Sequence, residues 1–166
     1  MSHKITPSFR SFFSTTIVLE QLIKTSVQAR LNDPNVNTVN IDLDINRVLA
    51  GIPVQISFMA FSIELGLKEL ITIETGEAPR GHRLNKLFLE LSEQAQLSIR
   101  QDVLNLLEGL TETDFDEQLS LNANAFTDWR YFHESDNNSC DKDFLGNLLC
   151  SINNYSVKLN REIKNA

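Results

Sequence analysis

The residues best suited to chemistry lie late in the sequence, where Arg130, His133 and Glu134 stand close together. A histidine exchanges a proton near neutral pH, and an arginine stabilises the anionic phosphorane that forms when a phosphodiester is attacked. This combination therefore predicts phosphodiester chemistry. The alternative is structural: His133 would hydrogen-bond Asn122 or a backbone carbonyl, and Arg130 would pair with Glu134 at i+4.

One long helix over residues 114–134 is expected to position these side chains. It opens with an Asp114-x-x-Glu117 arrangement that resembles a capping box. At 100° per residue, one apolar stripe would run along this helix and carry His133 on its buried face. The stripe consists of Phe115, Leu119, Asn122, Phe126, Trp129 and His133.

A second candidate site is the run Arg80-Gly81-His82-Arg83, which precedes an expected helix. Helix N-termini favour negative charge, so Arg80 and His82, with Asn122, are candidate ligand-binding residues for an anion. In the alternative reading His82 caps or packs against the helix, and the arginines are simply solvated.

A third pair, Glu64 and Lys68, has the i, i+4 spacing and order that favour an ion pair, and we interpret it as structural. The sequence has no P-loop, GxGxxG, HExxH or spaced cluster of metal ligands. We therefore expect neither a cofactor nor a metal.

Hydrophobic periodicity predicts an all-α fold, an up-and-down antiparallel helical bundle in a single domain over residues 1–166. Residues 39–46 alternate between apolar and polar, so a strand, a small hairpin and a loop all remain open there. Ser92 is a candidate N-cap. Helices are expected over residues 6–30, 53–74, 84–91, 92–110, 114–134 and 144–159.

The composition restricts the class of protein and its partners. The chain has 166 residues, 42% of them hydrophobic, and a formal net charge of −7. An acidic chain is a poor match for broad binding to nucleic acid, and DNA is not an expected partner. Two cysteines without metal or redox spacing, no recognisable signal peptide and no 20-residue apolar run predict a cytoplasmic protein without a membrane span.

The segment 53–74 is apolar on most faces, so it is expected to be the central helix. Part of its surface, or of the helix over 114–134, should be covered by a second subunit. The sequence therefore predicts a homodimer.

Three motifs together resemble the HEPN superfamily. They are Glu64-Leu-Gly-Leu-Lys68-Glu-Leu-Ile, then Gly81-His82-x-Leu84-x-x-Leu87-Phe88-x-x-Leu91, then Phe126-x-x-Trp129-Arg130-Tyr131. The resemblance covers about residues 53–159.

The resemblance implies an antiparallel bundle that dimerises. Many members of the family are metal-independent ribonucleases of toxin–antitoxin, phage-defence or RNA-processing systems. Their site is an Arg-x(4 to 6)-His motif in a late helix, and its arginine corresponds by context to Arg130. RNA and an antitoxin-type protein are the partners implied.

The histidine of that motif is not at the expected spacing, because the positions counted from Arg130 hold Ser135, Asp136 and Asn137. The expected function is therefore an RNA-associated protein with weak or no ribonuclease activity. The alternatives are a non-catalytic homodimeric interaction or small-ligand-binding module, or the partner of a nucleotidyltransferase.

Overall fold

The computed structural model describes residues 9–32, 51–130 and 140–165, and this part of the chain is all-α. Its helices are α1 (Phe9–Leu31), α3 (Ile52–Thr75), α4 (Leu84–Leu89), α5 (Glu93–Leu106), α6 (Glu112–Leu121), α7 (Ala125–Arg130) and α8 (Lys142–Asn165). The predicted all-α bundle is confirmed. The candidate extended segment 39–46 lies outside the described residues, and so does the expected start of the first helix at residue 6.

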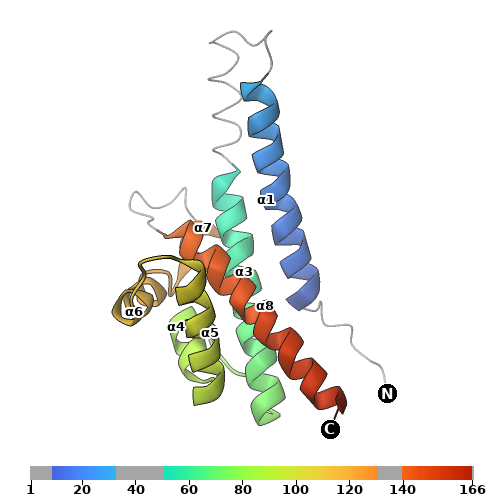
Figure 1. Cartoon of the computed structure of the whole chain (residues 1–166), viewed down its shortest axis with the longest axis vertical. Helices are drawn as coiled ribbons and strands as arrows, with labels where there is room; N and C mark the ends of the chain where they lie inside the picture. Colours follow the sequence, from blue (N-terminus) through green and yellow to red (C-terminus); the bar gives the residue numbers. More distant parts are fainter. Residues whose placement is uncertain (1–8, 33–50, 131–139, 166) are drawn as a thin grey trace.

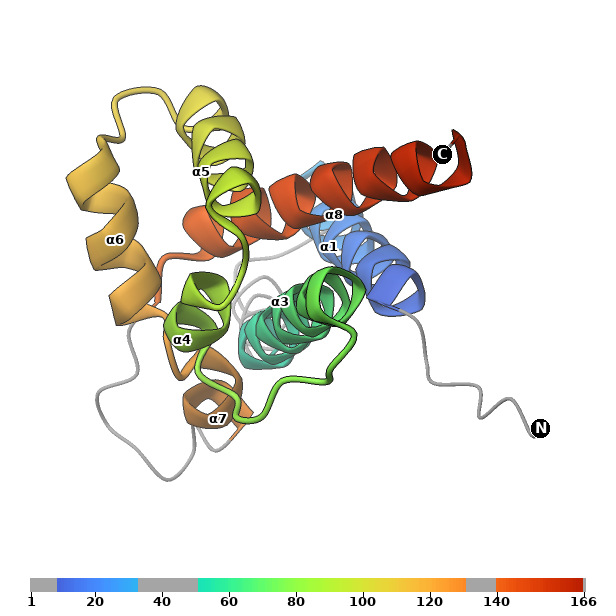
Figure 2. The same ribbon diagram turned by 90° about the horizontal axis from the view of Figure 1, so that it is seen from below.

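Helix α3 lies at the centre of the bundle, as its sequence predicts. Seen end-on in Figure 2, it is surrounded by α1, α4, α7 and α8, and each of these packs against it. Helix α5 packs on α8, and α6 joins α4 and α5 in an outer group. Figure 1 shows α1 running alongside α3 in the opposite direction, whereas α8 crosses α3 in the same general direction.

The core is built on the apolar faces of α3, α4, α5, α6 and α8. Full burial of one Leu, Ile or Phe side chain contributes about 1.5–3 kcal/mol, so this core is the main source of stability. The largest fully buried side chains include Met59, Ile63, Leu67, Leu70, Leu84, Leu87, Phe88, Phe115, Phe144 and Leu145.

Short polar contacts fix where the helices begin. Ser92 is the N-cap of α5, as predicted, and its Oγ accepts a hydrogen bond from the Ala95 N–H at 3.3 Å. The same Oγ donates to Glu74 Oε1 at 2.7 Å, which ties the start of α5 to the end of α3. At α6, Thr111 and Asp114 form a capping box.

The long helix expected over residues 114–134 is wrong, because α6 ends at Leu121 and α7 begins at Ala125. Its expected start is also wrong, since Thr111 and not Asp114 is the N-cap. The break has a tertiary cause. Between the two helices the Ala123 carbonyl accepts the backbone N–H of Leu84, which begins α4.

The side-chain amide of Asn122 stabilises this break, because both its nitrogen and its oxygen form hydrogen bonds. Its Nδ2 donates to the Gln118 carbonyl at 2.8 Å, and its Oδ1 accepts the Asp141 N–H at 3.3 Å. The amide thus caps α6 and holds the residue that precedes α8. A continuous helix would leave the backbone N–H groups of Leu84 and Asp141 without the acceptors that they have here.

Gly66 of α3 lies directly against side chains of α1 and α8. A methyl group added there would lie 2.7 Å from Ile152 Cγ2 and 2.8 Å from Phe9 Cε2. Glycine at this position therefore lets α1 and α8 pack directly on the backbone of α3.

We expect Gly66→Ala to lower the free energy of unfolding by up to about 2 kcal/mol. Overpacking typically costs about 1–3 kcal/mol, which outweighs the gain of about 1 kcal/mol in helix propensity. Gly146→Ala on α8 is the matched control, because a methyl group there meets nothing within 4 Å. It should stabilise the protein by about 0.5–1 kcal/mol in urea unfolding. Equal effects of the two substitutions would contradict the packing seen at Gly66.

Candidate functional site

Two of the sequence motifs, the Glu64–Lys68 pair and the segment around His82, meet at the Glu64 carboxylate. Glu64 Oε1 lies 2.9 Å from Lys68 Nζ and 2.8 Å from His82 Nδ1. The Glu64 side chain is 3% exposed, whereas that of His82 is 69% exposed. The expected Glu64–Lys68 ion pair is therefore present, and the histidine joins it from the segment between α3 and α4.

The cluster sets the orientation of the imidazole. A neutral His82 that donates its Nδ1–H to Glu64 carries its lone pair on Nε2. That nitrogen is then available to accept a proton or to contact an anion after protonation. Glu64 Oε2 is buried and makes no hydrogen bond. A buried carboxylate in this state depends on its ion pair with Lys68 and its hydrogen bond with His82.

The residues on either side of His82 form the turn that leads from α3 into α4. Gly81 has φ 93°, a left-handed conformation that favours glycine, and it turns the chain back toward α3. Arg83 is the N-cap of α4 and has no side-chain cap hydrogen bond. The candidate ligand-binding residue Arg80 is exposed in the same segment.

Arg130 is exposed at the end of α7, and its guanidinium lies 5.0 Å from the centre of the Phe126 ring. The Phe126 ring stacks on Phe61 of α3 at 4.9 Å and 28°. Phe61 in turn meets the edge of Phe12 of α1 at 5.0 Å and 89°. We call Phe12, Phe61 and Phe126 the aromatic bridge, since they join α1, α3 and α7.

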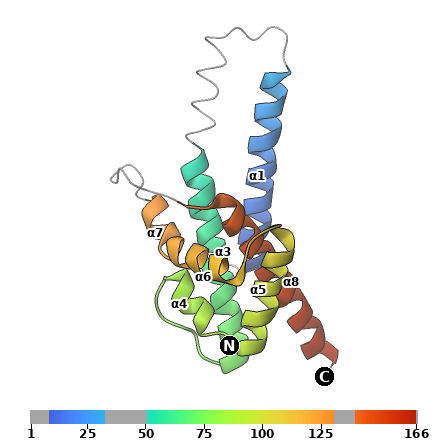
Figure 3. The ribbon, with the colours of Figure 1, turned by 60° about the vertical axis from the view of Figure 1, so that its left-hand side comes forward.

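The aromatic bridge and the carboxylate cluster are neighbours on α3. Phe61 and Glu64 are three residues apart, a spacing that places side chains on adjoining turns of one helix face. Figure 3 shows α7 beside the first half of α3, with the segment leading to α4 below it. The face of α3 from Phe61 to Lys68 is therefore the candidate site.

The other candidate residues have different outcomes. His133 and Glu134 lie outside the described residues. Asn122 is buried, and its amide oxygen and nitrogen both bond to backbone groups, so this side chain holds helices together. Trp129 is half-buried, and its indole N–H is buried without a hydrogen bond.

Sequence reasoning missed the aromatic bridge. Phe61 stands in an apolar helix where nothing in the local pattern separates it from core residues. Its contacts with Phe12 and Phe126 come from distant parts of the chain. A spacing argument along one helix could not reveal them.

The described residues contain no group of three or more histidine, cysteine, aspartate and glutamate side chains that could hold a metal ion. Cys140 and Cys150 are free thiols. None of the helices in the described ranges is long and apolar enough to cross a membrane. Comparison of the chain with protein-family models, with curated proteins and with solved structures found no match in any of the three.

Burial of the Glu64 charge leads to a prediction. Lys68→Met should lower the free energy of unfolding by about 1–3 kcal/mol, because it leaves a buried carboxylate with one partner fewer. The double variant Glu64→Gln/Lys68→Met should lose less than Lys68→Met alone, since it removes both charges. Urea unfolding at neutral pH measures all three proteins.

The Glu20–Lys24 pair on α1 is the matched control, with the same i, i+4 spacing and the same 2.9 Å distance. The Lys24 side chain is 71% exposed, so solvent screens this pair. Lys24→Met should therefore change stability far less than Lys68→Met. Equal losses in the two variants would show that burial of Glu64 has no energetic effect.

Proposed function

We propose that this chain is a HEPN-like, RNA-associated helical protein with weak or no ribonuclease activity. The observation that carries the proposal is that Arg130 is exposed at the end of α7, with its guanidinium over the Phe126 ring of the aromatic bridge. Proteins bind single-stranded RNA by stacking bases on aromatic rings and arginine planes while cations contact the phosphates. Arg130 and Phe126 supply both elements at one place on the surface.

The cations beside the bridge support the same proposal. Lys68 lies about two turns further along α3 than Phe61, and Arg80 is exposed in the segment between α3 and α4 that carries His82 to Glu64. In a chain of net charge −7, phosphate binding needs such a local group of cations. Because these contacts are electrostatic, binding should weaken as salt concentration rises.

Binding is better supported than cleavage. Metal-independent cleavage of RNA needs groups that accept and donate protons at the reacting phosphate. Within the described residues His82 is the one histidine, and its Nδ1 is held by Glu64. The proposal therefore assigns Arg130 a binding role and assigns no residue to catalysis.

We expect Arg130→Ala and Arg130→Lys each to weaken binding of a fluorescent single-stranded RNA by about tenfold. Lysine keeps the charge but cannot stack or make a bidentate phosphate contact. Loss of one stacked or charge-assisted contact costs about 1–3 kcal/mol, and 1.4 kcal/mol corresponds to tenfold. Fluorescence anisotropy at low salt measures the affinity.

Arg161→Ala is the control variant, since Arg161 is exposed near the far end of α8. It should bind RNA as the parent protein does. Equal binding by all four proteins, or no binding by the parent, would overturn the proposal. Metal-independent cleavage of RNA that disappears in Arg130→Ala would show instead that the site is a ribonuclease.

A second candidate function, a homodimeric interaction module, is favoured by exposed apolar residues on α1 and α3. Val18 and Leu22 of α1 are exposed, and so are Val54 and Phe58 of α3. Phe58 is 37% exposed although it belongs to the central helix. Exposed apolar groups on adjacent helices are typical of surfaces that a partner covers.

This second function makes a different prediction. The parent protein should be a dimer by light scattering at micromolar concentration, and Leu22→Glu or Phe58→Glu should make it monomeric without unfolding it. Ile163→Glu is the control, because Ile163 is a similarly exposed apolar residue at the end of α8. A parent protein that is monomeric at all concentrations would exclude this function.

A further inference from the structure

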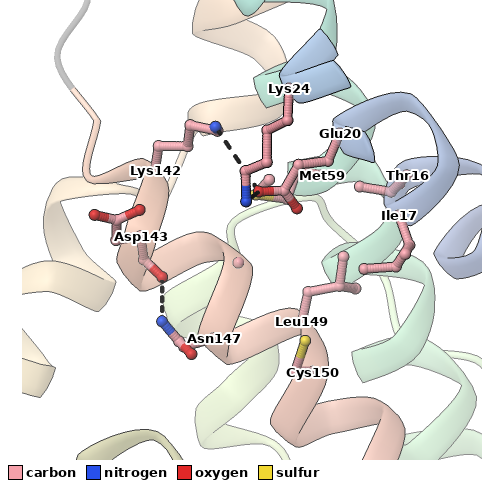
Figure 4. A pocket seen from close by; sticks show the side chains of 11 residues that line it. Thr16, Ile17, Glu20, Lys24, Met59, Lys142, Asp143, Asn147, Leu149 and Cys150 are labelled. Atoms are coloured by element: carbon pink, nitrogen blue, oxygen red, sulfur yellow. Dashed lines mark hydrogen bonds and ion pairs between the residues drawn. The ribbon is translucent and has the colours of Figure 1, made fainter. Parts of the chain in front are cut away.

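A pocket lies on a different face from the candidate RNA site, between α1, α3 and α8 (Figure 4). Its volume is about 250 Å³, just below the range of about 300–1,000 Å³ typical for small-molecule sites. One wall is apolar and is formed by Ile17, Met59 and Leu149. Charged residues also line the pocket, so it is amphipathic.

The charged side consists of two lysines around one carboxylate. Lys24 Nζ lies 2.9 Å from Glu20 Oε1, and Lys142 Nζ lies 4.0 Å from the same oxygen. A hydrogen bond to Glu20 and the negative charges of Glu20 and Asp143 raise the pKa of Lys24, so this amine is protonated at neutral pH. At 4.0 Å the Lys142 ammonium is attracted to Glu20 but does not form a hydrogen bond to it.

This arrangement favours an anion over a cation. An incoming cation would meet two ammonium groups whose shared carboxylate is already engaged. An incoming anion would meet Lys142 at the first turn of the 24-residue helix α8, where the helix dipole also favours negative charge. Figure 4 shows the Asp143 carboxylate directed away from the Glu20–Lys24 pair.

Gly146 keeps the pocket open. It lines the pocket from within α8, and a methyl group added there would have no atom within 4 Å. Inside a helix, alanine is favoured over glycine by about 1 kcal/mol. Stability alone would therefore favour a side chain at this position, and its absence leaves room beside the apolar wall.

Cys150 completes the lining as a neutral thiol. Burial raises its pKa, and the negative charges of Glu20 and Asp102 add to this effect. The thiolate is the nucleophilic form of cysteine, so this group is poorly reactive at neutral pH. Cys150 therefore forms part of the pocket wall, and we propose no covalent reaction for it.

We propose that this pocket binds a small organic acid with an apolar body. Its carboxylate would contact Lys142 and Lys24, and its apolar body would lie over Gly146 against Met59 and Leu149. The acid would share the lysines with Glu20 and leave the aromatic bridge untouched. This site is therefore independent of the proposed RNA site.

The test uses hexanoate as the probe and hexanol and hexylamine as matched neutral and cationic probes. By titration calorimetry or protein NMR, hexanoate should bind saturably and at least about tenfold more tightly than either analogue. Lys142→Gln should weaken hexanoate binding at least tenfold. Lys158→Gln, an exposed lysine further along α8, should not weaken it.

Gly146→Ala and Gly146→Leu separate occupancy of the pocket from loss of fold. Both variants place a side chain where the apolar body of the acid would lie, so both should weaken hexanoate binding, and Gly146→Leu should abolish it. The melting temperature of Gly146→Ala without ligand should be equal to or above that of the parent. Hexanoate binding that is unchanged in Lys142→Gln and in folded Gly146→Leu would overturn the proposal, as would absence of saturable binding.

The two cysteines provide an independent readout. Hexanoate should slow alkylation of Cys150 by iodoacetamide at least severalfold. It should leave unchanged the rate at Cys140, whose pKa burial raises to about 11. Equal protection of both thiols would indicate general stabilisation of the fold and would contradict binding at this pocket.

Discussion

Helix α3 is apolar around most of its circumference, and an apolar helix is stable in water only where other elements cover it. The remainder of the bundle supplies this cover, with α1, α4, α7 and α8 packed on its sides. Gly66 makes part of this packing possible, because side chains of α1 and α8 reach the backbone of α3 there. The positions of the other helices follow from this central requirement.

Polar contacts then decide how the short helices lie on α3. Glu64 binds His82 before α4, and Glu74 binds Ser92 before α5. Each contact joins a carboxylate of α3 to the residue that leads into a short helix. The apolar faces provide most of the stabilisation without direction, whereas hydrogen bonds have a defined geometry and fix the register.

The same packing leaves two surfaces with different chemistry. On the face toward α7, the aromatic bridge brings three rings together and places Arg130 above them. On the face toward α8, the helices enclose a pocket whose lysines surround Glu20. The first surface suits a stacked base with a phosphate, and the second suits a compact acid. Both proposals rest on side chains that the coverage of α3 brings together.

The sequence by itself determined the helical class, the long helices and the Ser92 cap, because hydrophobic periodicity and capping are local properties. It also determined the Glu64–Lys68 pair, whose spacing is set within one helix. It could not determine the break at Asn122, since continued periodicity predicts one helix through residues 114–134. Only the tertiary structure decided that break, through hydrogen bonds from the backbone N–H groups of Leu84 and Asp141, which are distant in the chain. The approach of His82 to Glu64, the aromatic bridge and the pocket have the same origin. Each depends on the packing of separate helices around α3, and no local pattern encodes it.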